Sequence, residues 1–413
     1  MAASAEVTGA GDGGASPGPL PRILLATDVD LSAGSRGAGR TLVNLISRYP
    51  ADRLMALSTS HRVPFETAAG HRVLPAAPGV PGRVAQWLRP RIGHVDAAWT
   101  QLRPLPHGDA VARFAPELVV AVPTNAVGVA LAGKCAGLAP MVVYMMDDWL
   151  AHQPGARMAF DTRARGRNLL RRAVAWLAIS TYLSNAMRAF AGLERPVHVV
   201  HNAVRTGDAM PSALERPRSG RFRVAYAGSV WPMHWDAVAA IAQGIRRLRE
   251  AGSDMELVLF TDRFFWGRHG AQWRRWGVVD GGLVPYDALP AALADCDLLL
   301  VASSFDPAQA HMSRSSLQTK VTDYMAAGRP ILACGPADSA SNVFLRERGC
   351  AYFAEDPSPE AIDAALRACV EDRVEGPAIA RRAWVVAKRD HDIGTVSDAL
   401  YAFLSDVARD PQG

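Results

Sequence analysis

Short apolar runs alternate with helical patterns along most of the chain. Each run is short enough to be a buried strand, and the stretches between runs, such as residues 126–136, carry apolar residues at helical spacing. In the first half of the chain, strands are expected at residues 22–27, 54–57, 118–122, 141–146, 176–179 and 198–200. A series of this kind is typical of a parallel sheet with helices packed on its faces.

The pattern stops at residues 202–220 and then begins again. This stretch is rich in proline, serine and charged residues and lacks periodicity, so it is predicted to be an interdomain linker. After it, strands are expected at residues 222–226, 257–260, 298–302, 331–333 and 351–353, and helices at residues 237–250, 286–294 and 342–348. The predicted fold class is therefore α/β, with two Rossmann-like, doubly wound parallel-sheet domains that face each other across a cleft.

The length of the chain agrees with two domains, because 413 residues exceed what a single core usually holds. Residues 1–20 are rich in Gly, Ala and Ser and are expected to be a disordered tail. The N-terminal domain is predicted to span residues 21–201, and the C-terminal domain residues 221–385. A helix in residues 386–413 is predicted to cross back to the first domain because of the position of its apolar residues, Val396, Leu400, Phe403 and Leu404.

The composition is that of a soluble globular protein, with 49% apolar and 21% charged residues. The net charge is +5, but aromatic residues are not interleaved with basic ones in an RNA-binding pattern, so no nucleic acid partner is expected. Five cysteines without CxxC spacing look like reduced packing residues, which favours the cytoplasm. No apolar segment is long enough to span a bilayer.

Basic charge is concentrated in one segment that runs into apolar residues. Its arginines are Arg163, Arg165, Arg167, Arg171 and Arg172, and its apolar residues are Leu169, Leu170, Val174, Trp176 and Leu177. A basic helix with an apolar side can lie on an anionic membrane, so peripheral contact at the inner face of the membrane is one prediction. A surface helix with solvated arginines is the alternative. A second basic and aromatic patch supports the membrane interpretation: Trp87, Leu88, Arg89, Arg91, Trp99 and Arg103.

The run SRSSLQTKVTDYMAAGRP, residues 313–330, has the pattern of an anion-binding helix. It follows a predicted strand and ends before another, and the hydroxyls of its first serines can cap one continuous helix. Lys320 adds a full positive charge, and Asp323 lies three residues further on, where its carboxylate could accept hydrogen bonds from a ribose diol. A cation for diphosphate and an acid for ribose suit a nucleotide. An ordinary amphipathic helix with a solvated Lys/Asp face is the alternative.

A glycine-rich turn follows the first predicted strand. Gly34, Gly37 and Gly39 do not spell GxGxxG, but they leave backbone N–H groups open where a helix begins. Gly37 and Gly39 are therefore candidates for an acceptor or phosphate loop.

The two predicted domains and the TKVTDYMAAGRPILA run together resemble the retaining GT-B glycosyltransferases, in particular the glycogen-synthase-like family 4. The resemblance covers residues 22–404, and residue-level matches lie in the second half. The family signature has two glutamates separated by seven residues; Asp323 falls at the second, and Ser315 departs from the first. The resemblance implies that the first domain binds the acceptor and the second binds a nucleotide-sugar donor.

By this resemblance, Asp323 holds the donor ribose, and the position of Ser315 contacts the transferred sugar. Trp231 and His234 stand where the family often has cations, so Lys320 and Arg314 are expected to supply more of the charge. The other candidate donor-binding residues come from the YAGS turn and from the start of the expected helix: Gly228, Ser229, Ser316 and Thr319.

The run YMMDDWLAH, residues 144–152, resembles the strand end that faces the acceptor in the family. Asp147, Asp148 and His152 are therefore candidates for contacting the acceptor hydroxyl, and one of them for acting as catalytic base. Helix capping by Asp147 or Asp148 is the alternative.

The resemblance implies a glycosyltransferase that moves a hexose-type sugar from a nucleotide diphosphate sugar to a saccharide or lipid-linked acceptor, in polysaccharide or glycoconjugate biosynthesis. No metal and no cofactor other than the donor are expected. Two other functions stay open: a nucleotide-sugar 2-epimerase of the same fold, and an inactive protein that binds sugar nucleotides or glycans.

Overall fold

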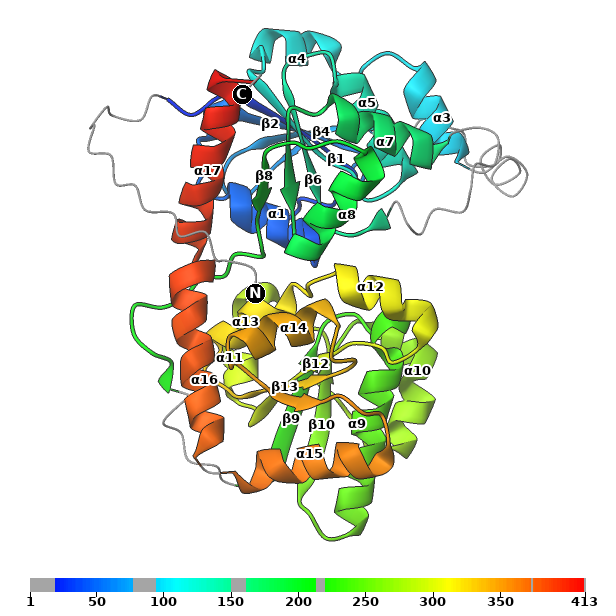
Figure 1. The fold of residues 1–413 in the computed structure, drawn as a ribbon, viewed down its shortest axis with the longest axis vertical. Helices are drawn as coiled ribbons and strands as arrows, with labels where there is room; N and C mark the ends of the chain where they lie inside the picture. Colours follow the sequence, from blue (N-terminus) through cyan, green and yellow to red (C-terminus); the bar gives the residue numbers. More distant parts are fainter. Residues whose placement is uncertain (1–18, 77–93, 150–160, 213–219, 373, 412–413) are drawn as a thin grey trace.

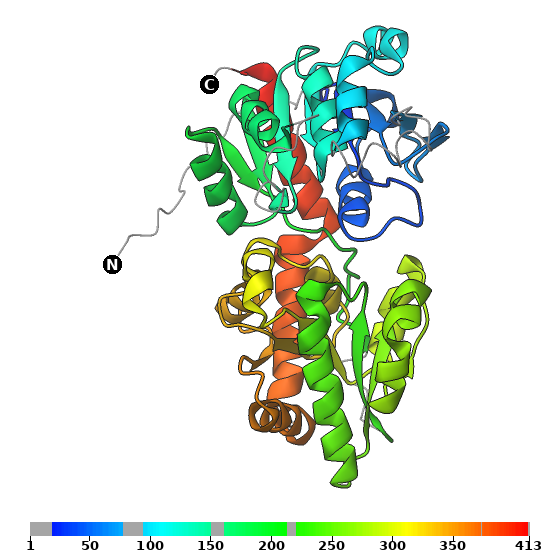
Figure 2. The ribbon, with the colours of Figure 1, turned by 90° about the vertical axis from the view of Figure 1, so that its right-hand side faces the viewer.

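Two lobes are stacked along the long axis of the protein in the computed structural model, which describes residues 19–76, 94–149, 161–212, 220–372 and 374–411 (Figure 1). Each lobe has one sheet at its centre with helices on both sides. Figure 2, turned by a quarter, shows the same two lobes and the junction between them. The predicted α/β class with two doubly wound sheets is confirmed.

An eight-stranded sheet forms the centre of the first lobe, and all of its neighbouring strands run parallel except β3 and β4. Strands β1 and β5 are buried throughout, because helices cover both faces of the sheet, and this explains their unbroken apolar sequences. In spatial order the strands are β3 (Phe65–Glu66), β4 (Arg72–Pro75), β2 (Leu54–Ser58), β1 (Ile23–Thr27), β5 (Leu118–Val122), β6 (Met141–Met145), β7 (Ala175–Ala178) and β8 (Val197–Val199). The helices are α1 (Ala38–Ile46), α3 (Val95–Leu102), α4 (Gly108–Phe114), α5 (Ala126–Cys135), α7 (Thr162–Arg172) and α8 (Thr181–Ala191).

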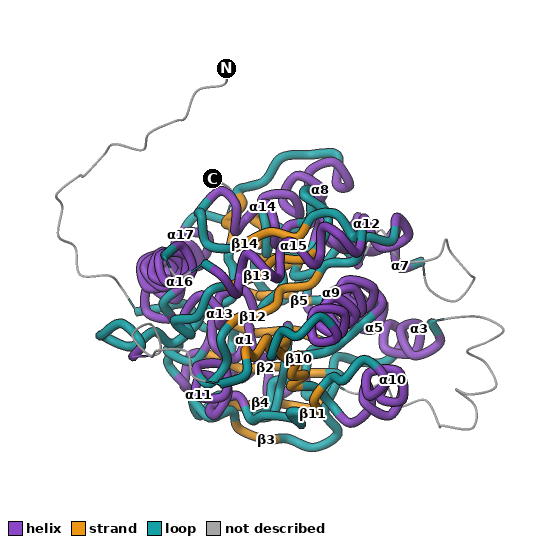
Figure 3. The backbone as a smooth tube through the Cα atoms, turned by 90° about the horizontal axis from the view of Figure 1, so that it is seen from below, coloured by secondary structure: helices purple, strands orange, loops and turns teal. Residues whose placement is uncertain are grey.

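The sheet of the second lobe has six strands, all parallel to their neighbours. In spatial order they are β11 (Val279–Asp280), β10 (Met255–Phe260), β9 (Phe222–Ala227), β12 (Leu298–Ala302), β13 (Ile331–Cys334) and β14 (Tyr352–Ala354). The helices are α9 (Pro232–Glu250), α10 (Arg263–Arg275), α11 (Leu289–Ala294), α12 (Ala310–Ser315), α13 (Lys320–Ala326), α14 (Ala340–Glu347), α15 (Pro359–Glu371) and α16 (Glu375–Val386). Figure 3 shows α16 on one side of this lobe and α10 on the other.

The prediction of a single helix from Ser313 onward is wrong, because the chain forms two short helices, α12 and α13. The loop between them is fixed to the sheet by Gln318, whose side-chain amide donates to the carbonyl of Ala302 at 2.8 Å and to the hydroxyl of Ser303 at 3.1 Å. The serines therefore do not cap a helix at this point. Ser313 lies inside α12, and Thr319 precedes α13 without a side-chain capping bond.

The basic segment is helical only as far as Arg172, and the strand expected at residues 176–179 follows it as β7. Helix α7 ends at Arg172, and Trp176 and Leu177 belong to β7, where both are buried in the core of the first lobe. Leu169 and Leu170 are buried in the same core. The apolar residues of this segment are thus used inside the lobe, which contradicts the prediction of an apolar helix side that could enter a membrane.

The chain crosses between the lobes twice, at the same edge of the molecule. The first crossing follows β8, and the second runs from α16 through a π-helical turn (Ala387–His391) into α17 (Ile393–Arg409). The two crossings pair at Val204 and Asp392, and the N–H of Ile393 donates to the carbonyl of Val204 at 3.0 Å. In Figure 1, α16 lies beside the second lobe and α17 beside the first.

Helix α17 packs on α1 of the first lobe. Leu400 and Leu404 are buried in the core of that lobe, and the Tyr401 hydroxyl donates to the carbonyl of Leu45 at 2.7 Å. An ion pair of 2.7 Å joins Arg48 to Asp398. The C-terminal helix therefore contributes to the core of the lobe that begins the chain.

Candidate functional site

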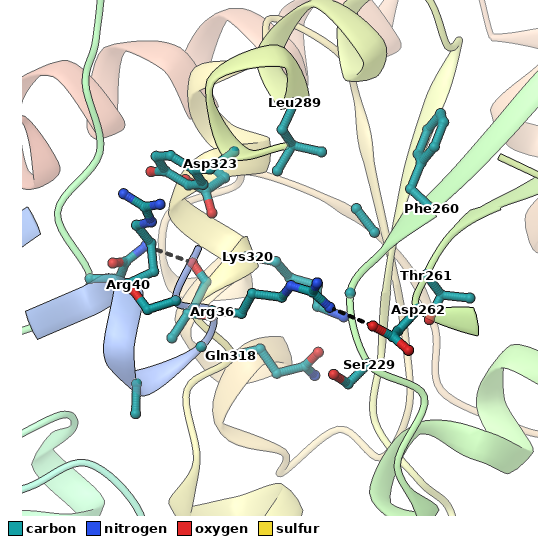
Figure 4. Close-up of a pocket in the computed structure, with 18 of the residues that line it drawn as sticks. Arg36, Arg40, Ser229, Phe260, Thr261, Asp262, Leu289, Gln318, Lys320 and Asp323 are labelled. Carbon is teal, nitrogen blue, oxygen red and sulfur yellow. Dashed lines mark hydrogen bonds and ion pairs between the residues drawn. The ribbon is translucent and has the colours of Figure 1, made fainter. Parts of the chain in front are cut away.

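A cavity of about 490 Å³ lies between the lobes, at the carboxyl ends of β1, β9 and β10 (Figure 4). The first lobe contributes the glycine-rich loop that follows β1, and the second contributes the turns after β9 and β10, the segment before α11 and the segment that leads into α13. In open parallel sheets ligands bind beyond the carboxyl ends of the strands, which is where this cavity lies.

Lys320 is the central cation of the cavity. Its ammonium nitrogen is covered, lies 3.5 Å from the centre of the Tyr226 ring, and makes no hydrogen bond to any described residue. Burial lowers the pKa of Lys320 well below its ordinary value. An ammonium group that is covered and has no hydrogen-bond partner has a strong tendency to pair with an anion that enters the cavity.

His234, at the start of α9, adds no charge beside Lys320. It is buried, and burial, together with the nearby Lys320, lowers its pKa well below the ordinary value. The imidazole is therefore neutral at pH 7.

A chain of hydrogen bonds leads from the first lobe to Asp323. The side-chain amide of Asn44 donates to the Tyr286 hydroxyl at 3.2 Å, and this hydroxyl donates to the Asp323 carboxylate at 3.1 Å. Burial raises the pKa of Asp323 to about 7, while the bond from Tyr286 and the charge of Arg40 oppose that shift. The Arg40 guanidinium lies 4.2 Å from the centre of the Tyr286 ring.

Arg36 enters the cavity from the glycine-rich loop of the first lobe. Its side chain reaches across the cavity beside Lys320, and its Nη1 lies 3.1 Å from Oδ2 of Asp262 in the second lobe (Figure 4). Asp262 also accepts a hydrogen bond from the N–H of Phe264 at 2.8 Å, and this bond and Arg36 lower its pKa. The cavity thus brings Arg36 and Lys320 to one place from different lobes.

Two acidic residues after β6 hold the lobes together. The Ser316 hydroxyl donates to Asp147 at 2.9 Å, and Nε2 of His311 lies 2.7 Å from Oδ2 of Asp148. Burial raises the pKa of Asp147, and the bond from Ser316 opposes this shift. Asn202 adds a further link between the lobes, since its side-chain amide donates to the carbonyl of Thr319 at 2.9 Å.

Among the described residues, no group of three or more His, Cys, Asp and Glu side chains has an arrangement that could hold a metal ion. A search of the same residues for a helix of sufficient length and apolar character to cross a bilayer found none.

Comparison with known proteins identifies the fold of the chain and the family of its second lobe. Residues 212–402 match the family described as Glycosyl transferase-like. Among solved structures, HepE from Anabaena in complex with UDP and glucose has 17% identity and a TM-score of 0.66, with 93% of this chain and 99% of that chain covered. The chain has the GT-B fold, and residues 212–402 form a glycosyl transferase-like domain. The predicted fold is confirmed, and the family match of the second lobe agrees with the predicted enzyme class.

Two further structures share the fold of this chain. Sucrose-phosphate synthase from Thermosynechococcus elongatus has 10% identity and a TM-score of 0.68, with 94% of this chain and 99% of that chain covered. The lipopolysaccharide outer core galactosyltransferase WaaB in its apo form has 13% identity and a TM-score of 0.58, with 94% and 98% covered. A search among curated proteins found no match.

Most of the candidate donor-binding residues line the cavity. These are Gly228, Ser229, Ser316, Thr319, Lys320 and Asp323. Gly37 of the expected acceptor or phosphate loop and the acceptor candidate Asp147 line it as well. Arg314, Ser315 and Gly39 lie outside the lining: Arg314 pairs with Asp338 at 2.7 Å, the buried Ser315 ends α12, and Gly39 packs against the carbonyl of Asp30. The predicted donor contacts of Arg314 and Ser315 do not fit these positions, because the break between α12 and α13 turns both residues away. The predicted role of Gly39 in an acceptor or phosphate loop does not fit its close packing against Asp30.

Asp148 lies outside the lining too, since it is engaged by His311. His311 belongs to α12 of the second lobe. His152 lies outside the described residues, as do Trp87, Leu88, Arg89 and Arg91 of the second basic patch.

Several lining residues were missed by the sequence reasoning: Arg36, Arg40, Asp262, Tyr286 and Gln318. For the two arginines a signal existed, because they stand beside Gly37 and Gly39 in the turn SRGAGR. For Tyr286 and Asp262 no local motif pointed to the cavity, since only the meeting of the two lobes brings them to it.

Proposed function

We propose that this glycosyltransferase uses a UDP-sugar as donor and binds its diphosphate between Lys320 and Arg36. The observation that carries this proposal is the covered ammonium of Lys320, which lines the cavity without a hydrogen-bond partner among the described residues. Structures of HepE with the same fold hold UDP, or UDP-glucose, which supports a uridine nucleotide. Two cations that come from different lobes and lie beside each other suit a diphosphate, whose charge a single helix end would neutralise only in part.

The remaining lining suits the rest of the nucleotide. Asp323 offers carboxylate oxygens to a ribose diol, as the family resemblance implies. Phe260, Leu283, Val284 and Leu289 give the cavity an apolar side of the kind that accepts a planar base. The base and ribose would then lie on the second lobe, and the diphosphate would point toward the first.

Sugar transfer requires a departing diphosphate beside a transition state with oxocarbenium character. Cations held in place before the reaction stabilise the developing negative charge without reorganisation. Lys320 and Arg36 are placed for this role, and neither needs a metal ion for it. His234 also lines the cavity, and because it is neutral it adds no charge beside Lys320.

The acceptor would enter from the first lobe, near the carboxyl end of β6. Asp147 lines the cavity, and its raised pKa is the property of a group that can exchange a proton with an acceptor hydroxyl. Asp148 is one position further on and pairs with His311. We propose Asp147 as the acceptor-facing residue and Asp148 as a residue that positions it; His152 stays a candidate.

The acceptor class is proposed to be a saccharide or a lipid-linked saccharide of polysaccharide or glycoconjugate biosynthesis. A cytoplasmic location with peripheral contact to an anionic membrane remains part of this proposal. Exposed arginines of α7, among them Arg163 and Arg167, would carry that contact by charge alone, because the neighbouring leucines are buried.

Titration calorimetry with UDP tests the donor assignment. The full chain is expected to bind UDP, and Lys320→Met is expected to weaken that binding by roughly tenfold or more. Equal affinity of the two proteins for UDP would contradict the proposal. Incubation of the UDP-sugar without acceptor, followed by analysis for an epimer, separates transfer from epimerisation.

A further inference from the structure

A second hollow lies on the outside of the second lobe. Its volume is about 340 Å³, and it is formed by α9, by the end of α10 and by the start of α15. Figures 1 and 3 show α9 and α10 side by side. Helix α9 serves both spaces, since Met233 and His234 line the interlobe cavity and Trp235 lines the hollow.

Two neighbouring tryptophans form part of the wall. The ring centres of Trp235 and Trp276 are 6.2 Å apart, and the ring planes are inclined by 36°. His269 stacks on Trp235 with a centre distance of 4.0 Å, which fixes the orientation of the indole. Ala239 and Ala240 of α9 line the hollow as well, and their small side chains leave its space open.

The charged groups of the hollow are bonded within the protein, apart from the covered Oδ1 of Asp236, which has no hydrogen-bond partner among the described residues. Arg247, the only Lys or Arg in the described lining, forms two hydrogen bonds to Asp363, of 3.0 and 2.6 Å. Asp236 accepts hydrogen bonds from the backbone N–H groups of residues 305 and 306. The groups that face solvent at the rim are the neutral amides of Gln243 and Gln272.

We propose that this hollow is an accessory saccharide-binding site, in which a neutral oligosaccharide stacks on Trp235 and Trp276. A pyranose ring has an apolar C–H face and a polar hydroxyl edge, and it matches an aromatic wall with amides at its rim. An anionic ligand fits less well, because Arg247 is committed to Asp363.

The position suits a glycan that extends beyond the interlobe cavity. Trp231 lines that cavity, is 49% exposed, and contacts Phe265 of α10 at a ring distance of 4.8 Å. Aromatic residues thus continue along α9 and α10 from the cavity toward the hollow. The inference rests on the proposed function in one respect, namely that the ligand is the acceptor or product glycan of the transfer reaction.

The test applies the full chain to an array of immobilised neutral oligosaccharides. The variants are Trp276→Ala and the rim variant Gln272→Ala, and the control is Trp99→Ala, an exposed tryptophan of the first lobe. Wild type and control are expected to bind at least one class of oligosaccharide, with roughly tenfold weaker binding for Trp276→Ala and roughly threefold weaker binding for Gln272→Ala. Absence of binding by the wild type, or equal binding by Trp276→Ala, would overturn the proposal.

A parallel UDP titration separates this inference from the donor proposal. UDP reports on the interlobe cavity alone, so its affinity is expected to be unchanged in all three variants. A wild-type protein that binds oligosaccharides but not UDP would contradict the donor assignment and leave the saccharide site standing. A wild-type protein that binds UDP but no oligosaccharide would contradict the saccharide site and leave the donor assignment standing.

Discussion

Nη1 of Arg36 lies 3.1 Å from Oδ2 of Asp262, so a cation of the first lobe and an anion of the second are paired across the cavity. Both side chains are substantially exposed, and a pair of this kind contributes little to stability. Its consequence concerns ligand binding, because a diphosphate that recruits Arg36 must compete with Asp262.

The two partners of this pair should therefore respond oppositely to substitution. Asp262→Asn removes the competitor and is expected to tighten UDP binding by roughly two- to fivefold, whereas Arg36→Ala is expected to lower kcat/KM by roughly tenfold. Calorimetry and a donor-turnover assay measure the two effects. If both variants weakened UDP binding alike, the pair would be structural only.

Lys320→Met should separate stability from activity. The pKa of Lys320 is lowered in the folded state, so the folded protein carries a penalty for the charged ammonium that the unfolded chain does not. Methionine removes this penalty, and Tm at pH 7 is expected to rise while kcat/KM falls by roughly tenfold or more. Scanning calorimetry and kinetics test this, and a fall in Tm would count against it.

Proton uptake gives a second measurement on Lys320. A bound diphosphate raises the pKa of Lys320, so the wild type is expected to take up protons when UDP binds at a pH at which Lys320 of the free protein is partly deprotonated. The binding enthalpy should then depend on the ionisation enthalpy of the buffer in the wild type. In Lys320→Met this dependence is expected to be smaller.

Asp323→Asn should change the pH dependence of stability. The pKa of Asp323 is about 7 in the folded protein and near 3.8 when unfolded, so its stabilising contribution is full at low pH and is lost as the pH rises through about 7. The variant lacks this loss, and its Tm relative to the wild type is expected to increase between pH 5 and pH 8. UDP binding should weaken at the same time; an unchanged affinity would remove Asp323 from the ribose site.

Asp148 and His311 form a pair between the lobes, and its two members should act as a unit. Asp148→Asn and His311→Gln are each expected to lower kcat/KM by roughly threefold to tenfold, and the double variant no further. Kinetics of the three variants measure this. A much larger loss for Asp148→Asn alone, of a hundredfold or more, would instead make Asp148 the catalytic base.

His201 and His391 should make the protein sensitive to acid. Their ring centres are 5.5 Å apart, and burial lowers the pKa of each to about 4. The unfolded chain binds these protons near pH 6.5, so the free energy of unfolding is expected to fall as the pH drops from 6.5 toward 4. Urea denaturation across this range measures the slope, which His391→Phe should reduce; an identical slope in the variant would refute the explanation.

The strands were predictable because a parallel sheet covered on both faces requires unbroken apolar runs. Residues 118–122 and 298–302 were predicted with the bounds of β5 and β12. Helix α10 was missed, because its sequence RFFWGRHGAQWRR places aromatic and basic residues around the helix without a clear apolar side. The short strands β3 and β11 carry too few residues to show a pattern.

The residues of the candidate site were predictable only where they lie close together in the sequence. Lys320 and Asp323 lie within one turn of each other, so their spacing placed them on one surface. The prediction for the segment before them, one continuous helix from Ser313, was wrong. The hydrogen bonds of Gln318 to the end of β12 fix a loop there, and they connect residues about fifteen positions apart in the sequence. Arg36 and Tyr286 reach the cavity through tertiary structure, which local spacing does not encode.

The pairing of Val204 with Asp392 ties the two interlobe connections to each other at one edge. Any separation of the lobes that preserves this pairing is a rotation about that edge, as in a hinge. Opening would then displace the glycine-rich loop from the turn after β10, and Arg36 would leave Asp262 while both connecting segments stayed in place. Donor binding and closure of the cavity would thus occur in one hinge rotation of the first lobe relative to the second.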